Sequence, residues 1–412
     1  MKETSIRKAS LSQNQKALRR LWKNKAAVFG GIIIGLAILV AILGYTISPD
    51  ATPGTNDQIP AIALADPGFS TTMLRVRKNS KVTSTNFFGK LLWGQPATHT
   101  QIPINHHFFR NDSILAIQYA GENPVTGARV DGQTLSLHLA EVVHPLAYEQ
   151  PPTRQNNQVG FTTIANITKQ QNITELQNQI VNENIINKKY ILGTDKYGRD
   201  MLSRLLLGVR ISLLTGLIAV LISLTIGIFL GAIAGYFGGR VDDLIMLLIN
   251  TVWSIPTLLL VFAIVLALGR GIGIIFLAVG LTMWVDVARI VRGQVMSFRK
   301  VQFVEAAQSL GFSTARILGR HIIPNILGPI MVIAAANFAT AILIEAGLSY
   351  LGFGIQPPTP SWGTMLNENY GYAIGGHPFL ALVPALAIML MVLAFNLIGN
   401  GLRDALDVNQ QI

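Results

Sequence analysis

The sequence contains no cysteine and few charged residues, and both absences restrict what it can be. None of its 412 residues is a cysteine, which excludes disulfides, thiolate metal sites and thiol nucleophiles. Only 13% are Asp, Glu, Lys or Arg and half are hydrophobic, whereas soluble domains carry about a quarter charged residues. This deficit indicates a protein of the lipid bilayer rather than a soluble domain with a large core.

Motifs for catalysis and nucleotide binding are also missing. There is no Gly-x-x-x-x-Gly-Lys-Ser/Thr loop, so the chain does not bind ATP in that manner. The segment GRGIG at 269–273 joins two apolar stretches and has no strand before it, so we interpret it as a tight turn and not as a dinucleotide loop. His106 and His107 are adjacent, point different ways and have no carboxylate at ligand spacing. We therefore expect no catalytic residue, no metal and no cofactor.

Basic residues are concentrated at the start of the chain. The first 25 residues hold eight Lys or Arg and a single acid, Glu3. Because an apolar stretch follows directly, the positive-inside rule accounts for them better than nucleic-acid binding does. Residues 1–25 are therefore predicted to be cytoplasmic. The stretch 26–47 is longer than the apolar part of a signal peptide and lacks an Ala-x-Ala ending, which predicts a retained membrane helix.

Six stretches are long and apolar enough to cross about 30 Å of hydrocarbon at about 20 residues each. They are 26–47, 207–235, 244–268, 272–291, 325–347 and 380–401. We predict an all-α membrane protein with six transmembrane helices and both termini in the cytoplasm, which also places the basic linker 292–324 there. Arg199, Arg204 and Arg210 fall on the outer side, against the rule. We expect an amphipathic helix on the membrane surface to hold them.

Ionisable residues within spans are the usual sign of a proton- or ion-driven carrier. Only Asp286 and Glu345 qualify. Asp286 is expected to pair with Arg289, three residues later, at the cytoplasmic interface. Glu345 lies near the outer end of the fifth span and is expected to reach the lipid headgroups. No acid or base is predicted at mid-membrane, so the energy for any transport is expected to come from another subunit.

Residues 48–190, between the first two spans, have a different composition. Proline-rich turns alternate with strand-like runs at 113–119 and 135–143, which predicts a β-containing domain. The stretch 173–190 has Ile and Leu at helical spacing, so we expect a helix leading back to the membrane. We predict an extracytoplasmic insertion domain over 48–190, followed by a domain of five transmembrane helices over 191–412.

The linker before the fifth span carries a short amphipathic helix. Phe303, Ala307 and Leu310 share one face of it, with Val304 beside them, while the polar positions 305 and 308 face away. A simple connector needs only about five residues. A structured, partly apolar helix of this kind predicts a docking element.

A glycine separates this helix from a second one. Gly311 can adopt the left-handed conformation that ends a helix, and Ser313 is a suitable cap for the next. The second helix carries Arg316 and Arg320 and is expected to run to Pro324, where the fifth span begins. The docking helix would thus be joined rigidly to a membrane span.

EAAQSLG at 305–311, followed by HIIP at 321–324, resembles the EAA loop of the inner-membrane permease subunits of ATP-binding-cassette (ABC) importers. Three further stretches are similar to the dipeptide, oligopeptide and nickel branch of that family. They are LGTDKYGRDMLSRLLLGVRISL (192–213), EAGLSYLGFGIQPPTPSWGTML (345–366) and NLIGNGLRDALD (396–407). The resemblance covers about residues 15–50 and 190–408, and leaves out most of the insertion.

This resemblance implies a multi-pass protein of the bacterial inner membrane that imports peptides. Its partners would be a second homologous permease, two ATPase subunits that hydrolyse the ATP, an extracytoplasmic substrate-binding protein and membrane lipid, with no nucleic acid. Coupling to the ATPase would fall to the EAA-loop residues Glu305, Ala306, Ala307, Gly311 and Pro324.

Other functions stay open on the sequence alone. Nickel or another small solute could be the substrate of a similar permease. A stand-alone carrier or channel would need its own coupling residues or pore ring, which are not seen. A membrane-anchored interaction protein would use 48–190 as its working part and would leave the spans without motifs.

Overall fold

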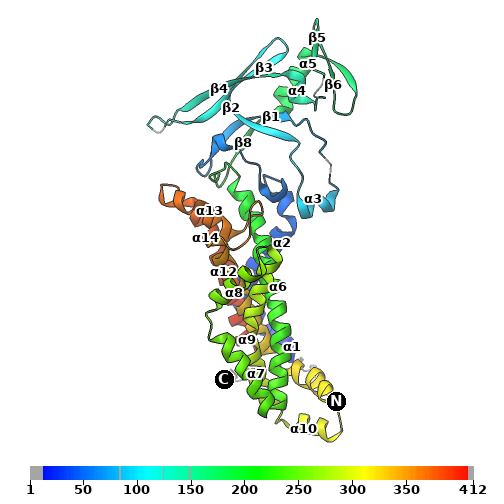
Figure 1. Ribbon diagram of the computed structural model, residues 1–412, viewed down its shortest axis with the longest axis vertical. Coiled ribbons are helices and arrows are strands. Elements are labelled where there is room, and N and C mark those ends of the chain that lie inside the picture. The colour runs from blue at the N-terminus through cyan, green and yellow to red at the C-terminus, as the bar shows by residue number, and fades with distance from the viewer. Residues whose placement is uncertain (1–12, 83–84, 124, 148–149, 407–412) are drawn as a thin grey trace, which may run out of the picture.

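The computed structural model describes residues 13–82, 85–123, 125–147 and 150–406. The molecule is elongated, with a bundle of long helices at one end and β-sheets at the other (Figure 1). The long helices are α2 (Lys25–Ile47), α6 (Met201–Phe237), α9 (Ile272–Phe298), α12 (Leu327–Tyr350) and α14 (Phe379–Leu406). Two shorter ones, α1 (Gln13–Lys23) and α13 (Trp362–Ile374), flank the bundle. Five of the predicted spans thus appear as helices.

The remaining predicted span, 244–268, is broken in two. Helix α7 (Gly239–Trp253) and helix α8 (Thr257–Leu268) meet at an angle of 88°. Pro256 stands at the start of α8, and its ring and missing N–H do not allow the preceding helix to continue through it. In the described chain, five helices are long and apolar enough to cross a membrane, or six if this bent pair is one span. The multi-span helical architecture is confirmed with five to six apolar spans, and the predicted span 244–268 is a bent pair of helices and not one continuous helix.

Small residues let the two central helices approach closely. A Cβ added to Gly227 of α6 would lie 2.5 Å from Val287 of α9, and one added to Gly231 would lie 2.5 Å from the Ala288 carbonyl oxygen. Membrane helices without a hydrophobic driving force between them pack through contacts of this kind. Helices α6 and α9 therefore form the rigid centre of the bundle.

The helices alternate in direction, so the two ends of the bundle differ. Asn24, just before α2, donates to the carboxylate of Asp404 near the end of α14 at 3.3 Å. Helix α10 (Gln302–Ser309) lies at this same end, and the sheets lie at the opposite one (Figure 1). The chain thus enters and leaves the bundle at the α10 end.

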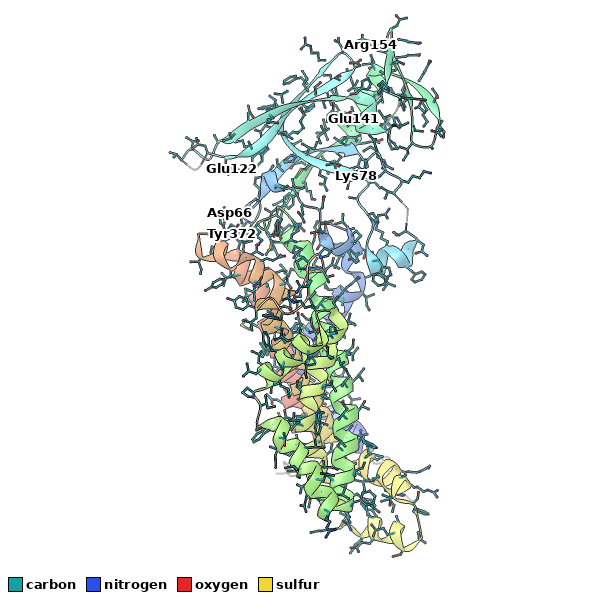
Figure 2. The ribbon with its side chains drawn as sticks, in the orientation of Figure 1. Asp66, Lys78, Glu122, Glu141, Arg154 and Tyr372 are labelled. Carbon is teal, nitrogen blue, oxygen red and sulfur yellow. The ribbon has the colours of Figure 1, made fainter. Side chains whose placement is uncertain are left out.

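The insertion between α2 and α6 contains two antiparallel sheets. The larger has the strand order β4-β3-β2-β1-β8 and the smaller β5-β6-β7. The strands are β1 (Ser70–Arg77), β2 (His99–Arg110), β3 (Ser113–Glu122), β4 (Arg129–His138), β5 (Thr153–Gln155), β6 (Gln158–Thr162), β7 (Thr168–Asn172) and β8 (Ile185–Lys189). Helices α4 (Leu139–Val143) and α5 (Ile173–Gln179) close a core that includes Leu74, Ile114 and Phe161. Glu141 and Arg154 lie far from the bundle, whereas Asp66 and Tyr372 lie where the insertion meets it (Figure 2).

Two local predictions for the insertion are partly wrong. The strand expected over 135–143 ends at His138, and α4 follows. The helix expected over 173–190 ends in a π-turn at 180–184, after which β8 pairs with β1 (Met73 opposite Ile186). Asn184 stops the helix here because its amide donates to the carbonyls of Arg75 (2.6 Å) and Val142 (3.1 Å). A β-sheet edge, not a helix, therefore returns the chain toward the membrane.

Candidate functional site

Helix α10 is a two-turn helix that ends at a glycine. Gly311 has a φ of +76°, as the sequence predicted, and a Cβ there would meet no atom within 4 Å. The N–H of Phe312 donates to the Ala307 carbonyl at 3.1 Å, and that of Gly311 donates to the Gln308 carbonyl at 2.9 Å. These two bonds are the pair that closes a Schellman ending. The chain therefore reverses direction at Gly311 without displacing any neighbouring side chain.

The inner face of α10 is fixed to the bundle. Val304 and Ala307 are buried, and they share one apolar cluster with Ile317 and Ile322 from the following segment and with Tyr236 at the end of α6. Branched and small side chains fill the space between α10 and the bundle, which we call the apolar seam. Movement of α10 therefore requires movement of the ends of α6 and α9.

The outer face carries the rest of the motif. Phe303 is 41% exposed and Leu310 is 73% exposed, and Glu305 and Ala306 are exposed as well. Phe303 and Leu310 were expected to share one face of the helix with Ala307, but they are exposed whereas Ala307 is buried, so this expectation is wrong. The packed stripe runs through Val304 and Ala307, and the Gln308 amide beside it donates to the Tyr236 hydroxyl at 3.3 Å. Ala306 is exposed, whereas the adjacent Ala307 is buried.

A continuous helical run of 37 residues, Thr314–Tyr350, joins this segment to the bundle. It begins with α11 (Thr314–Arg316), passes through a π-turn and a 3₁₀-turn at 317–326, and continues as α12. Pro324 lies in the 3₁₀-turn, where its missing N–H leaves the regular ladder one bond short. Ser313 does occupy the cap position, but its side chain makes no capping hydrogen bond. The segment around α10 is thus linked to a membrane helix, as expected.

A cluster of charged side chains lies at the end of the bundle opposite α10. Arg199 Nε donates to Asp195 Oδ2 at 2.6 Å, and its Nη2 donates to Glu368 Oε2 of α13 at 2.5 Å. Arg204 Nη2 reaches the same Glu368 oxygen at 3.1 Å. All four side chains are at most 8% exposed. The expected amphipathic surface helix is therefore wrong, since these arginines are buried and paired where the insertion meets α6 and α13.

Arg210 is also held by the protein and not by a membrane surface. Its guanidinium donates to four backbone carbonyls, two in α2 and two in α3 (Phe87–Trp93), a short helix of the insertion. The acceptors are Ala41 (2.5 Å), Ile42 (3.0 Å), Leu91 (2.7 Å) and Leu92 (3.0 Å). The planar fork of an arginine can reach several acceptors in this way, which a lysine cannot.

The two acids expected near membrane interfaces behave differently from the prediction. Glu345 is fully buried, and its Oε1 accepts from Ser349 at 2.7 Å. Side chains on a helix tilt toward its N-terminus, so an acid near the end of α12 points back into the bundle and not toward headgroups. In the described residues no ion pair joins Asp286 to Arg289; the Arg289 guanidinium lies 4.3 Å from the Trp253 ring centroid. Both expectations are wrong.

Glu368 was not identified from the sequence as the partner of Arg199 and Arg204. Asp195 and Arg199 are four residues apart in a turn before α6, where their side chains meet. Glu368 lies 169 residues from Arg199, so no local pattern could have joined them. The motif stretches at 192–213 and 345–366 meet at this junction.

Comparisons with known proteins agree with this architecture. Residues 227–409 match the family model "Binding-protein-dependent transport system inner membrane component". Residues 12–67 match the "N-terminal TM domain of oligopeptide transport permease C". Neither match includes the sheets of the insertion.

Individual relatives align over about half of the chain. The oligopeptide transport system permease OppC of Bacillus subtilis is 41% identical over 221 residues, 54% of this chain and 72% of the relative. The dipeptide permease DppC of the same organism is 42% identical over 52% of this chain and 67% of its own length. The glutathione permease GsiD of Pectobacterium atrosepticum is 43% identical over 52% and 71%.

The helices, the reversal at Gly311 and these matches define a multi-pass inner-membrane permease, the membrane component of a transporter and not its ATPase. The chain belongs to the OppC/DppC/GsiD family of ABC-importer permeases.

Proposed function

We propose that the chain forms, with a second homologous permease, the path by which peptides enter the cell. Two ATPase subunits would bind at the α10 end, and a substrate-binding protein would bind at the other. The matched relatives are named for oligopeptides, dipeptides and glutathione, which are all short peptides. Nickel or another small solute is the alternative substrate, and uptake assays with labelled peptides and metal salts separate them.

The observation that carries the coupling role is the two-sided character of α10. Its inner side is buried through Val304 and Ala307, while Phe303, Ala306 and Leu310 offer a partly apolar outer surface with Glu305 beside them. An ATPase that grips the outer face would move the inner face as one body with α6, α9 and the run into α12. Such rigid-body motion is how packed elements transmit a distant event.

Ala306 provides the sharpest test of this docking role. Ala306→Trp adds a large ring to the outer face without touching the buried seam. It should lower co-purification of the ATPase and substrate-stimulated ATP hydrolysis at least tenfold. Ala128→Trp, at an exposed alanine of the insertion, is the matched control and should change neither. Full assembly and hydrolysis with Ala306→Trp would show that α10 is only a connector.

Glu305 tests the electrostatic part of the same contact. Glu305→Lys reverses an exposed charge near the start of α10, so it should weaken coupling and leave thermal stability unchanged. Glu305→Gln, which keeps the shape, should have an intermediate effect. Equal hydrolysis in the wild type and both variants would remove Glu305 from the coupling residues.

We further propose that the α10 end and both termini are cytoplasmic and that the insertion, 48–190, lies outside. Because the chain lacks cysteine, single cysteines report this orientation cleanly. Ser136→Cys on the insertion should react with an impermeant maleimide in intact spheroplasts. Ser309→Cys on α10 should react only after permeabilisation. Both side chains are exposed, so the reverse pattern would overturn the orientation.

The insertion is proposed to shape the docking of the binding protein and not the path itself. Ser70 and Lys189 lie opposite each other on β1 and β8, so a short flexible linker between them can replace the intervening residues. The shortened chain should retain its bundle but bind the binding protein more weakly. Unchanged uptake and unchanged affinity in a well-expressed variant would make the insertion a tolerated surface addition.

A further inference from the structure

Helix α3 of the insertion exposes an unusual amount of apolar surface for its size. Four of its seven residues are large and apolar with most of the side chain exposed. They are Phe87 (68%), Phe88 (69%), Leu92 (59%) and Trp93 (74%). In an aqueous domain such a group of aromatic side chains would be costly and prone to association, so a partner surface is expected to cover it.

The helix is held in a fixed place by its two ends. Asn86 caps its start by accepting from the Gly89 N–H at 2.7 Å. Its end contacts the top of α2: a Cβ added to Gly94 would lie 2.6 Å from the Ala51 carbonyl oxygen and 2.8 Å from the Tyr45 ring. The Arg210 guanidinium donates to the last carbonyls of α3 and to carbonyls of α2, and so links the two helices at this point. The apolar side chains are therefore presented from an anchored backbone.

The level of α3 along the bundle identifies the surface that it meets. Arg210 joins it to the carbonyls of Ala41 and Ile42, five to six residues before the end of α2 at Ile47. Gly94, which follows α3, lies against Tyr45 and Ala51 at the end of α2. Helix α3 therefore stands level with the last turns of this membrane helix, the part of a span that approaches the lipid headgroups.

The exposed side chains of α3 also continue a surface that faces lipid. Along α2, large apolar side chains are about half exposed, as expected for a helix at the edge of a membrane bundle (Phe29, Ile32, Leu36, Leu39 and Ile42). Helix α3 stands beside the upper part of α2, below the sheets (Figure 1). Aromatic side chains and a lysine (Lys90, exposed) are the residue types enriched at membrane interfaces.

We propose that α3 is an interfacial anchor that inserts its aromatic side chains into the lipid surface and ties the insertion to the bilayer. Lys90 extends to the phosphate level, while Phe88 and Leu92, one turn apart on the same face, enter the acyl boundary. The insertion is then attached through α3 both to the protein, by the hydrogen bonds of Arg210, and to the lipid.

Lipid contact can be measured with a single fluorophore in the cysteine-free chain. Leu92→Cys, labelled with an NBD probe, is placed in lipid nanodiscs with phosphatidylcholine that carries a nitroxide near the top of the acyl chain. We expect strong quenching by this lipid and weak quenching by aqueous iodide. Leu36→Cys on α2 is the control for lipid contact, and Ile167→Cys, exposed on the insertion far from α2, is the control for water.

Each outcome decides the proposal. Nitroxide quenching at 92 several-fold above that at 167 supports it. Iodide quenching at 92 as strong as at 167 overturns it, because α3 would then lie in water. Shielding from both quenchers also overturns it, because a protein surface would then cover α3. Phe88→Asp in the labelled chain should lower the nitroxide quenching at 92 by at least half, whereas Phe108→Asp, at an exposed strand position, should leave it unchanged.

Discussion

The two ends of the helix bundle are joined to their neighbouring segments by different chemistry. At the insertion end, Asp195, Arg199, Arg204 and Glu368 form a buried network of charges. At the α10 end, small and branched apolar side chains form the seam, with Val304 at its centre. The first seam demands one geometry, because a buried charge without its partner is costly. The second accepts small shifts, since apolar contact has no directional requirement.

This difference fits the roles proposed for the two ends. The insertion has its own apolar core, and the charge network fixes the segment that leads from it into α6. Helix α10 is too short to fold by itself, and it depends on the bundle for the burial of Val304 and Ala307. Its apolar contacts persist through small shifts, so α10 can stay attached while the bundle moves.

Removing Glu368 should break the charged seam and give the largest effect. Glu368→Ala leaves Arg199 and Arg204 buried with half of their partners, which costs about 3–5 kcal/mol. The measurement is the midpoint of thermal unfolding in detergent, followed by size-exclusion chromatography. Glu305→Ala, an exposed acid on α10, is the control and should change stability by less than about 0.5 kcal/mol. Equal effects of the two variants would show that the network does not hold the junction.

Shortening Val304 should break the apolar seam with a smaller loss. Val304→Ala removes two buried methyl groups, for a cost of about 2 kcal/mol including the cavity. Phe303→Ala, next to it but on the outer face, should cost less than about 1 kcal/mol because its ring is already partly exposed. Hydrogen exchange over 302–312 separates the two: only Val304→Ala should speed it. Faster exchange in Phe303→Ala alone would contradict the assignment of faces.

Gly311 tests whether backbone geometry supports the apolar seam. Gly311→Ala places a Cβ at a φ of +76°, where no atom would clash, so the whole cost is backbone strain of about 1–2 kcal/mol. Gly319→Ala is the control, since it is open to solvent and has no positive φ. It should be neutral or slightly stabilising, as alanine is in a helix. Only Gly311→Ala should therefore lower the unfolding midpoint, and an equal fall in Gly319→Ala would contradict the role of the positive φ.

Acid should weaken the insertion and leave the α10 seam unaffected. Burial, together with Arg75 and Arg77, lowers the pKa of His99 from its ordinary value of 6.5 to about 4. Between these values the unfolded chain binds a proton that the folded chain does not, so stability is full above pH 6.5 and falls as the pH drops toward 4. Burial also lowers the pKa values of His138 and His144, which adds to the same trend.

The loss of stability from histidine protonation is the smallest of the four predicted stability effects, because His99 is only about half buried and solvent screens its charge. His99→Gln should reduce the difference between unfolding midpoints at pH 7.5 and pH 5. His106→Gln, at an exposed position on the same strand, should leave that difference as in the wild type. An unchanged pH dependence in His99→Gln would place the acid sensitivity elsewhere.

Much of the fold was predictable from local patterns. Apolar runs of sufficient length gave the membrane helices, and the change of composition after Ile47 gave the insertion with its strands. The segment around α10 was located by its motif and by Gly311, whose conformation depends on its own missing side chain. The length and apolar character of 244–268 predict one span, whereas Pro256, also visible in the sequence, marks the place where the helix breaks.

What the sequence determined by itself is therefore local: which segments enter the membrane, where strands begin and where the chain reverses. These depend on residues within a few positions of one another. Only the tertiary structure decided which alanine of the motif faces outward, that Glu345 points into the bundle, and that Glu368 pairs with two arginines more than 160 residues away. The reason is physical: the environment of a side chain is set by whichever helix packs against it, and no local pattern encodes that neighbour.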